Sequence, residues 1–247
     1  MTAASPGGAP RCICLWSGPR NVSTALMYSF RQRSDTRVVD EPLYGHYLRV
    51  SNAKHPDRDL VLARMNLDGN AVMDQLLADD CDRPVLFLKQ MAHHLDQLDR
   101  AFLARTDNIF LIRDPGQMLP SLVNQIPEPN LRDTSLCIQA DLFDELVDLG
   151  QNSPVLDSRH LLLDPAGVLA ELCRRLRLPF EPAMLSWLAG PKPEDGIWAP
   201  HWYNNVHKST GFLPFAEKTT PFPDRLKPLL NECRPCYQRL VRYAIKS

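Results

Sequence analysis

The sequence predicts an α/β protein, with a parallel β-sheet covered by helices on both faces in three α/β/α layers. Short apolar runs of strand length alternate along the chain with longer segments whose apolar residues recur at helical spacing. Several of the strand-like runs also end in a polar or charged residue. Ligands of such folds bind where the carboxyl ends of the parallel strands meet, so we expect these residues to form one site.

Five strands are predicted from the apolar runs. They cover residues 12–16, 36–40, 84–89, 108–113 and 154–156. The third and fourth runs, PVLFLK and NIFLIR, are apolar almost throughout, which is typical of strands that are buried on both faces.

Helices are predicted between and after these strands. They cover residues 23–33, 70–79, 97–105, 117–125, 134–150, 165–178 and 226–241. The clearest is 134–150, because Leu136, Ala140 and Phe143 share one helical face and Gly150 can end the helix.

Two stretches are predicted to be irregular. Residues 46–68 are mostly polar, and the His55-Pro56 step opposes a helix there. Residues 126–133 carry two prolines and are expected to form a mobile loop. Pro228 and Pro235 are expected to kink or break the C-terminal helix.

Residues 11–247 are predicted to form a single domain, preceded by a short disordered leader at residues 1–10. Residues 179–222 are rich in proline and tryptophan and lack periodicity. We interpret them as a cap or loop region over the site rather than as a second domain.

The composition excludes several classes of function. Lys and Arg number 28 and Asp and Glu 29, so no overall basic charge favours nucleic acid or an anionic membrane. No apolar span reaches the roughly 18 residues of a membrane helix. Histidines and carboxylates lack metal-ligand spacing, so no metal is expected.

The cysteines indicate a cytoplasmic location. The chain has seven, an odd number, and their positions follow no disulfide-scaffold spacing. We therefore expect buried reduced thiols, as in cytoplasmic proteins. Cys233 and Cys236 form a C-x-x-C pair with no second pair beside it, and we interpret the pair as structural.

The strongest motif is the strand–turn–helix at residues 11–30. Its turn begins at Ser17 and Gly18, and Ser23 and Thr24 follow where the first turn of a helix is expected. A helix N-terminus offers free backbone N–H groups and the positive end of the helix dipole. With the guanidinium of Arg20 beside it, this turn is suited to a phosphate or a sulfate.

This turn does not fit the phosphate-binding loop of ATP-dependent enzymes, G-x-x-x-x-G-K-[ST]. If Thr24 is the final hydroxyl residue, Ser23 stands at the lysine position. Ser17 and Val22 then stand where the two glycines belong. The mismatch argues against ATP hydrolysis.

A second motif follows the fourth predicted strand, in the stretch IFLIRDPGQMLPSL at residues 109–122. Arg113 ends the strand, and Ser121 lies eight positions later. An arginine at a strand end and a serine one short helix away can both bind one phosphate, the arginine through two hydrogen bonds.

Together, the two motifs resemble the donor site of P-loop sulfotransferases, over roughly residues 11–180. The resemblance implies a P-loop NTPase-like fold and 3′-phosphoadenylyl sulfate as co-substrate. It implies that Arg20 contacts the transferred sulfuryl group, and that Arg113 and Ser121 bind the 3′-phosphate of the donor. The turn implied to hold the 5′-phosphosulfate comprises Ser17, Gly18, Asn21, Val22, Ser23 and Thr24.

A looser similarity lies at residues 207–212, HKSTGF, where the family has a glycine-containing loop that contacts the same donor. Lys208 and Gly211 are the donor-binding candidates there. Asn21 and Val22 depart from the Ser-Gly that the family usually has at their positions.

The sequence offers two kinds of candidate for the general base, a histidine and a glutamate. The acceptor must lose a proton, and similar enzymes use a histidine after the third strand or a glutamate. The pair His93 and His94 lies a few residues beyond the usual histidine position, where Met91 stands, and Glu41 follows the second strand. Lys89 ends the apolar third strand, which indicates an anionic partner.

The resemblance therefore predicts transfer of a sulfuryl group to a hydroxyl or amine of a small acceptor. One alternative is a nucleotide-dependent small-molecule kinase. Another is a non-catalytic protein that keeps the fold for binding. The acceptor and the oligomeric state stay open at this point.

Overall fold

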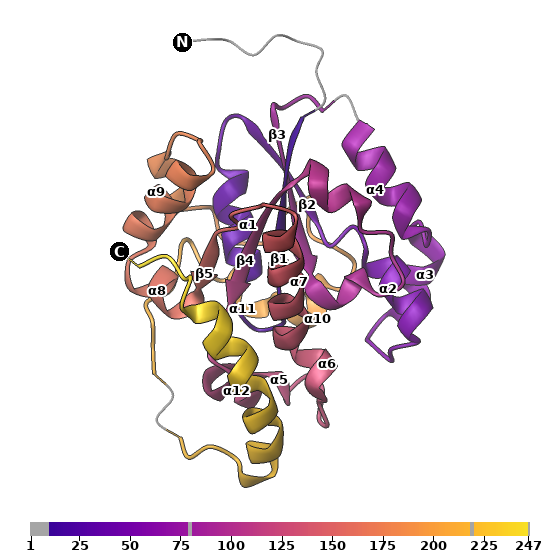
Figure 1. Cartoon of the computed structure of the whole chain (residues 1–247), viewed down its shortest axis with the longest axis vertical. Helices are drawn as coiled ribbons and strands as arrows, with labels where there is room; N and C mark the ends of the chain where they lie inside the picture. The colour runs from indigo at the N-terminus through magenta and orange to yellow at the C-terminus, as the bar shows by residue number, and fades with distance from the viewer. Residues whose placement is uncertain (1–9, 79–80, 218–219, 247) are drawn as a thin grey trace.

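The computed structural model describes residues 10–78, 81–217 and 220–246. The predicted leader at 1–10 lies outside these ranges apart from its last residue. Five parallel strands form one sheet in the order β2-β3-β1-β4-β5. The α/β architecture is confirmed, and Figure 1 shows the sheet between helices.

All five predicted strands are present. They are β1 (Arg11–Ser17), β2 (Thr36–Asp40), β3 (Val85–Met91), β4 (Asp107–Ile112) and β5 (Val155–Asp157). Strand β3 runs two residues past Lys89, because its pairing with β1 continues to the pair Ser17–Met91.

The two faces of the sheet carry separate hydrophobic clusters, which create the three layers. From β1, Ile13 and Leu15 face one cluster, and Cys14 and Trp16 face the other. The first cluster is covered by α1 (Ser23–Arg31), α8 (Ser158–Leu163) and α9 (Pro165–Arg175). The second is covered by α4 (Gly69–Ala78), α5 (Pro115–Leu122), α7 (Leu136–Asp148) and α12 (Lys227–Val241). Helices α7 and α12 lie in front of the sheet in Figure 1.

The layers open a crevice between β1 and β4. These strands are neighbours, but the chain leaves β1 for α1 on one face and leaves β4 for α5 on the other. Connections that part in this way leave space at the carboxyl ends of the strands. Arg20 and Arg113 follow these two strands, so the fold brings both motifs to the same crevice.

The prediction that residues 46–68 are irregular is wrong. They contribute to two helices, α2 (Tyr44–Ser51) and α3 (Arg58–Arg64). Tyr44, Tyr47 and Leu48 are buried on one side of α2 in a third hydrophobic cluster. Pro56 lies between the helices and not inside either, so it separates two helices that the polar composition hides.

Three further elements differ from the predictions. The helix at 97–105 is reduced to a 3₁₀ helix at Ala101–Arg105, and another 3₁₀ helix at Ala92–Leu95 follows β3 directly. The loop at 126–133 ends in α6 (Leu131–Thr134), which Asn130 and Asp133 cap reciprocally.

Of the predicted kink or break in the C-terminal helix, the break is wrong, because α12 is one helix. Pro228 lies in the first turn, where its missing N–H is not needed, and Pro235 lies within the helix. The predicted cap region contains a 3₁₀ helix at Pro182–Leu185 and the short helices α10 (Ala199–Trp202) and α11 (Asn204–His207). Another 3₁₀ helix, Asp224–Leu226, follows the cap.

The expectation of reduced thiols fails for one pair. Cys137 and Cys236 form a disulfide that joins α7 to α12 across 99 positions of the sequence. Cys236 is thus not paired with its C-x-x-C neighbour Cys233, which is a buried free thiol. The two helices already pack together in the second cluster, which brings these cysteines within reach.

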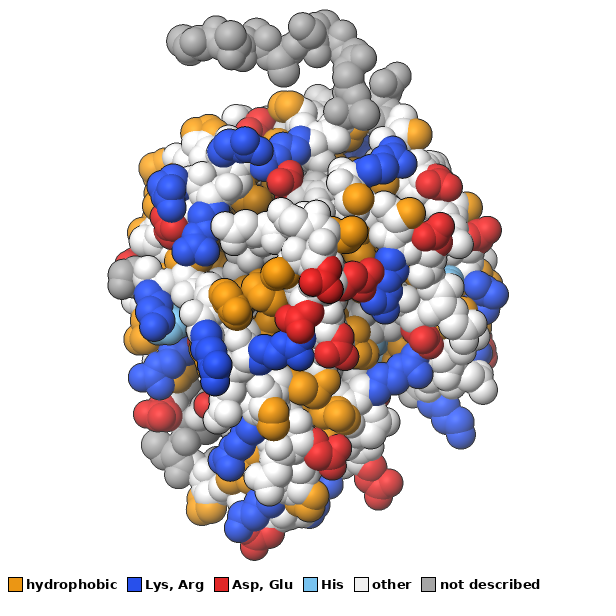
Figure 2. All heavy atoms as spheres, viewed as in Figure 1, with side chains coloured by type: hydrophobic (Ala, Val, Ile, Leu, Met, Phe, Trp, Pro, Cys, Tyr) orange, Lys and Arg blue, Asp and Glu red, His pale blue; other side chains and the backbone are white. Residues whose placement is uncertain are grey.

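Within the described ranges, no helix is long and apolar enough to cross a membrane. The same part of the chain holds no group of three or more His, Cys, Asp or Glu that could bind a metal ion. On the face shown in Figure 2, basic and acidic side chains are interspersed, as the balanced composition implies.

Candidate functional site

A cavity of about 500 Å³ lies at the carboxyl ends of the strands. Residues 19–25, in the turn after β1 and the start of α1, form one side of it. Residues from the ends of β2, β3 and β4 form the floor, and α2 and the cap region supply the other walls. The cavity therefore brings together segments that the sequence spreads over nearly 200 positions.

The turn after β1 has an unusual backbone. Arg20 and Val22 both adopt the left-handed conformation, with φ of 59° and 65°. Gly18 is required by packing, since a Cβ atom there would lie 2.5 Å from the carbonyl oxygen of Thr134. Asn21 donates a side-chain hydrogen bond to the carbonyl oxygen of Leu111 in β4, at 2.6 Å. The turn is thus held against β4 and the end of α6.

Arg113 strengthens that attachment. Its guanidinium donates to the carbonyl oxygen of Arg20 at 2.6 Å. Arg20 in turn donates from Nε to the hydroxyl of Ser121 at 2.9 Å and from Nη1 to the carbonyl oxygen of Trp202 at 3.5 Å. The three residues of the two motifs are therefore neighbours, and Ser121 contacts Arg20 rather than Arg113.

Arg20 and Arg113 form no ion pair with a carboxylate of the described residues, although Asp157 and Asp114 act on Arg113 from farther away. Burial lowers the pKa of both guanidinium groups, and the charge of Arg20 adds to the effect on Arg113. Both line the cavity beside the first turn of α1, whose N–H groups have no intrahelical acceptor. This end of the cavity is suited to a bound anion.

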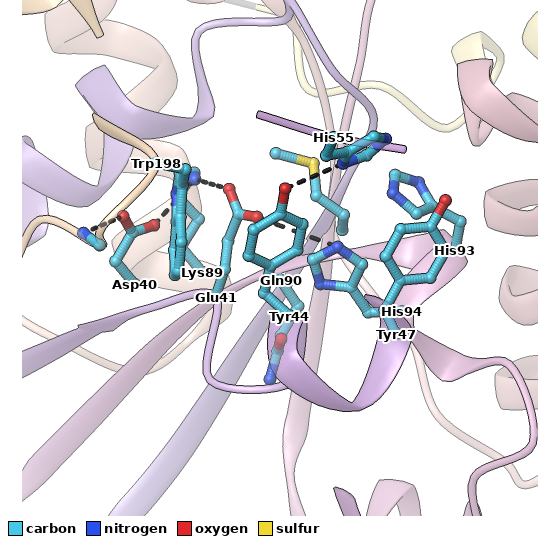
Figure 3. Close-up of polar contacts among 12 residues, drawn as sticks. Asp40, Glu41, Tyr44, Tyr47, His55, Lys89, Gln90, His93, His94 and Trp198 are labelled. Atoms are coloured by element: carbon cyan, nitrogen blue, oxygen red, sulfur yellow. Dashed lines mark hydrogen bonds and ion pairs between the residues drawn. The ribbon is translucent and has the colours of Figure 1, made fainter. Parts of the chain in front are cut away.

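A buried charge cluster forms the other end (Figure 3). The ammonium of Lys89 is fully buried and lies 2.9 Å from Oδ1 of Asp40, and it also contacts Oε1 of Glu41. Its third partner is the hydroxyl of Tyr203, at 2.7 Å. That hydroxyl donates to Oδ2 of Asp40 at 2.7 Å and accepts from the indole of Trp198 at 3.0 Å. The cap region thus completes the coordination of a lysine in the sheet.

The cluster sets the protonation of both ionisable groups at this end. Burial alone lowers the pKa of Lys89, but the carboxylates of Asp40 and Glu41 outweigh it and raise that pKa. Burial raises the pKa of Glu41 to about 6, although the charge of Lys89 opposes the rise. Lys89 stays a cation, whereas Glu41 changes its charge close to neutral pH.

The two histidines after β3 differ in their contacts. Nδ1 of His93 is hydrogen-bonded to the hydroxyl of Ser135, and burial lowers the pKa of His93 to about 3. His94 is fully buried, and its Nε2 lies 3.9 Å from Oε2 of Glu41. Both rings pack against Tyr47, and burial keeps both neutral.

Most predicted site residues line the cavity. These are Arg20, Asn21, Val22, Ser23, Thr24, Glu41, Lys89, His93, Arg113, Ser121 and Gly211. Ser17, Gly18 and Lys208 are not among the lining residues. Ser17 is buried and donates to the carbonyl oxygen of Gln90 at 3.2 Å, and Lys208 is exposed. Gly211 also allows close packing, since a Cβ there would lie 2.9 Å from the Leu185 carbonyl oxygen.

Several residues of the site were not predicted. Tyr44, Tyr47 and His55 line a further wall of the cavity, and the contacts by which Asp40 and Tyr203 hold Lys89 were also missed. Asp40 had a signal in the sequence, because it ends β2 and pairs in register with Lys89. Tyr203 lies 163 positions from Asp40, and no local pattern links the two.

Fold and site together define a three-layer α/β protein with a cavity at the carboxyl ends of its parallel sheet. One end of the cavity is cationic, and the other holds a buried lysine–carboxylate cluster. Comparison with known proteins then gives the family. The chain belongs to the sulfotransferase family, because the model of the sulfotransferase domain matches residues 11–244.

Solved sulfotransferase domains share the fold. The sulfotransferase domain from the curacin biosynthetic pathway aligns with a TM-score of 0.56 and 17% identity, covering 96% of this chain and 99% of that one. A sulfotransferase from Alicyclobacillus acidocaldarius aligns with a TM-score of 0.53 and 14% identity, covering 98% of each chain. At these low identities the similarity shows a shared fold and nothing more.

Two relatives found by sequence similarity are named after aminotransferases rather than sulfotransferases. Branched-chain-amino-acid aminotransferase-like protein 1 of Arabidopsis thaliana is 38% identical over 232 residues, and protein 2 is 36% identical over 229. The matches cover 94% and 92% of this chain. The chain spans less than half of those proteins, 42% and 41% of their length, so their name describes much longer chains.

Proposed function

We propose that this protein transfers a sulfuryl group from 3′-phosphoadenylyl sulfate to a hydroxyl or amine of a small acceptor. The supporting observation is the convergence of Arg20, Arg113 and Ser121 on one end of the cavity, beside the start of α1. The other end holds Glu41, a carboxylate whose charge changes near pH 6.

The donor's charge matches the cationic end of the cavity. Two half-buried guanidinium groups and a helix N-terminus supply hydrogen bonds to phosphate and sulfate oxygens. Arg20 faces the group to be transferred in this proposal, and Arg113 and Ser121 face the 3′-phosphate. Lys208, which the structure leaves exposed, has no part in it.

Glu41 is the base in the proposed reaction. The acceptor oxygen or nitrogen bonds to sulfur while its proton passes to Glu41, and the bond between sulfur and the bridging phosphate oxygen breaks. His93 is a weaker candidate, because Nδ1 is bonded to Ser135 and burial holds its pKa at about 3. Lys89 holds Oε1 of Glu41 and adds positive charge near the reacting oxygens.

Heat-unfolding curves with adenosine 3′,5′-bisphosphate test the donor site. A ligand that binds only the folded protein raises its melting temperature. We expect stabilisation by this nucleotide and a smaller effect from magnesium–ATP. Stabilisation and turnover with magnesium–ATP alone would favour the kinase, although Ser23 stands where its lysine belongs.

A transfer assay tests catalysis separately. Incubation with labelled 3′-phosphoadenylyl sulfate and a panel of small alcohols, phenols and amines is expected to give labelled products. Tight nucleotide binding with no product across the panel would favour a non-catalytic binding protein. The cytoplasmic location and a small-molecule partner, with no nucleic acid or membrane, stay predictions.

A further inference from the structure

Gln139 is a fully buried amide near the start of α7. Its Nε2 donates to the carbonyl oxygen of Trp16 in β1 and to that of Leu111 in β4, each at 3.0 Å. The last residue pair in register between these two strands is Ser17 with Leu111. Gln139 therefore joins β1 to β4 at the point where their pairing ends and the crevice begins.

The carbonyl oxygen of Leu111 also binds the turn after β1. Nδ2 of Asn21 donates to it at 2.6 Å, so Asn21 and Gln139 together use both lone pairs of this oxygen. Asn21 lines the cavity, whereas Gln139 is not among the lining residues. Gln139 thus reaches the turn through one shared atom, from behind the cavity wall.

The two amides make these contacts with their nitrogens alone. Oδ1 of Asn21 and Oε1 of Gln139 are buried and have no hydrogen-bond partner among the described residues. Turning either amide round would place its oxygen against the Leu111 carbonyl oxygen, so the present orientation is the favoured one. An unpaired buried acceptor costs free energy, and packing alone would favour an apolar side chain. The donated N–H groups are therefore what these two residues supply.

The turn needs a tether of this kind because its backbone is strained. Asn21 lies between Arg20 and Val22, which have φ angles of 59° and 65°. Residues other than glycine keep such a conformation only where the surrounding contacts fix it. Arg113 fixes the turn through the carbonyl oxygen of Arg20, and Asn21 fixes it through β4. The second of these contacts depends on where the Leu111 carbonyl lies.

We propose that Gln139 is a positioning residue for the sulfuryl donor, acting through the Leu111 carbonyl and Asn21 on the turn after β1. This inference rests on the proposed sulfuryl transfer and concerns the donor end of the same site. Gln139 fixes the Leu111 oxygen, Asn21 binds that oxygen, and the turn then presents its backbone N–H groups and Arg20 at fixed places. A compact phosphate or sulfate depends on that placement, because hydrogen bonds weaken steeply with distance and angle.

Hydrogen–deuterium exchange in the ligand-free protein tests the positioning by itself. Q139M keeps the size of the side chain and loses its N–H groups, so we expect faster exchange in peptides that cover residues 17–25. Q90M is the matched control. Gln90 is also a fully buried glutamine with an unpaired Oε1, but its Nε2 faces the sulfur of Met73 at 3.9 Å. Exchange of the turn that is unchanged in Q139M, or equally faster in Q90M, would overturn the proposal.

Calorimetry with adenosine 3′,5′-bisphosphate tests the effect on the donor. We expect about tenfold weaker binding by Q139M and normal binding by Q90M. A double-mutant cycle tests the route: in an N21A background, Q139M should have little further effect on the affinity, because the tether is already lost. Losses that add in the double variant would assign Gln139 a general structural role and contradict the proposal.

A crystal structure of the parent protein with the same nucleotide supplies a test without substitutions. Asn21 and Gln139 are expected to keep their contacts to the Leu111 carbonyl while phosphate oxygens bind the turn. An Asn21 side chain that leaves Leu111 to bind the nucleotide would overturn the proposal. Failure of the proposed function has a different signature, since the parent protein would then bind no nucleotide, and the exchange of the ligand-free turn would still decide the role of Gln139.

Discussion

The guanidinium of Arg113, just past the end of β4, donates to the carbonyl oxygen of Arg20, in the turn after β1, at 2.6 Å. One candidate phosphate ligand therefore shapes the loop that carries another. Binding and loop geometry are coupled at this residue, so a change at Arg113 affects both. The coupling leads to the first prediction.

Replacing Arg113 by alanine is expected to weaken the binding of adenosine 3′,5′-bisphosphate by tenfold to about 150-fold, the effect of one hydrogen bond to a charged group. Isothermal titration calorimetry measures the affinity. R113K keeps the charge but loses the forked geometry, so its affinity for the nucleotide should lie between those of R113A and the parent protein. R234A, on the exposed side of α12, is the control. An unchanged affinity in R113A would remove Arg113 from the donor site.

The acid limb of the pH–rate profile is expected near pH 6. Glu41 has its pKa raised to about 6 by burial, and only its carboxylate form can accept a proton, so the rate rises with pH through that value. In E41Q, kcat should fall about 10²- to 10⁴-fold. The rise of the remaining rate with pH near 6 should also disappear. A limb that survives in E41Q would assign the base elsewhere, but not to His93, whose pKa of about 3 lies too low.

Tyr203→Phe removes a hydroxyl that serves Lys89, Asp40 and Trp198 at once. We expect a loss of about 1–3 kcal/mol in the free energy of unfolding, since buried partners are left unsatisfied. The hydrogen bond from this hydroxyl lowers the pKa of Glu41, so the acid limb should also move to higher pH. Urea unfolding and the rate profile give the two values. Y243F, at an exposed tyrosine, should change neither.

Val22→Gly is expected to stabilise the fold by about 1 kcal/mol. Val22 has a φ of 65°, a conformation that is strained for a β-branched residue and free of strain for glycine. V22A keeps a Cβ atom in that conformation and loses packing, so it should show no gain. If urea unfolding finds V22G less stable than the parent protein, the packing of Val22 against its cluster outweighs its strain.

Removing the link between α7 and α12 should destabilise the oxidised protein. C236S opens a loop of 99 positions, and we expect a loss of about 2–4 kcal/mol in non-reducing buffer that disappears with reductant. C81S, at a free cysteine, is the control. Thiol labelling of the protein in intact cells would show whether the pair is oxidised there and so test the predicted cytoplasmic location.

The sequence predicted the strands well, because each is a short apolar run and a parallel sheet buries both faces of most of its strands. It also predicted that Arg20 and Arg113 lie close together, since both come shortly after strands that lie side by side. Once the strand ends are located in the sequence, the residues that follow them can be placed at one edge of the sheet. Residues that follow neighbouring strands are then expected to lie close together.

Contacts between distant segments could not be predicted in the same way. Asp40 and Lys89 meet through strand register, and Tyr203 reaches them from the cap region. Helix α2 was missed because its polar residues and the nearby His55-Pro56 step mask the spacing of Tyr44, Tyr47 and Leu48. The pairing of Cys137 with Cys236 depends on how two helices cross, which no cysteine spacing shows.

Trp202 and Tyr203 are consecutive residues, yet the carbonyl of the first binds Arg20 and the hydroxyl of the second binds Lys89 and Asp40. One dipeptide of the cap thus spans the loop after β1 and the ends of β2 and β3. A graft that exchanged residues 179–222 for another segment would also exchange a ligand of a lysine in the sheet. The cavity is therefore easier to reshape on α2, where Tyr44 and Tyr47 line it without binding Lys89.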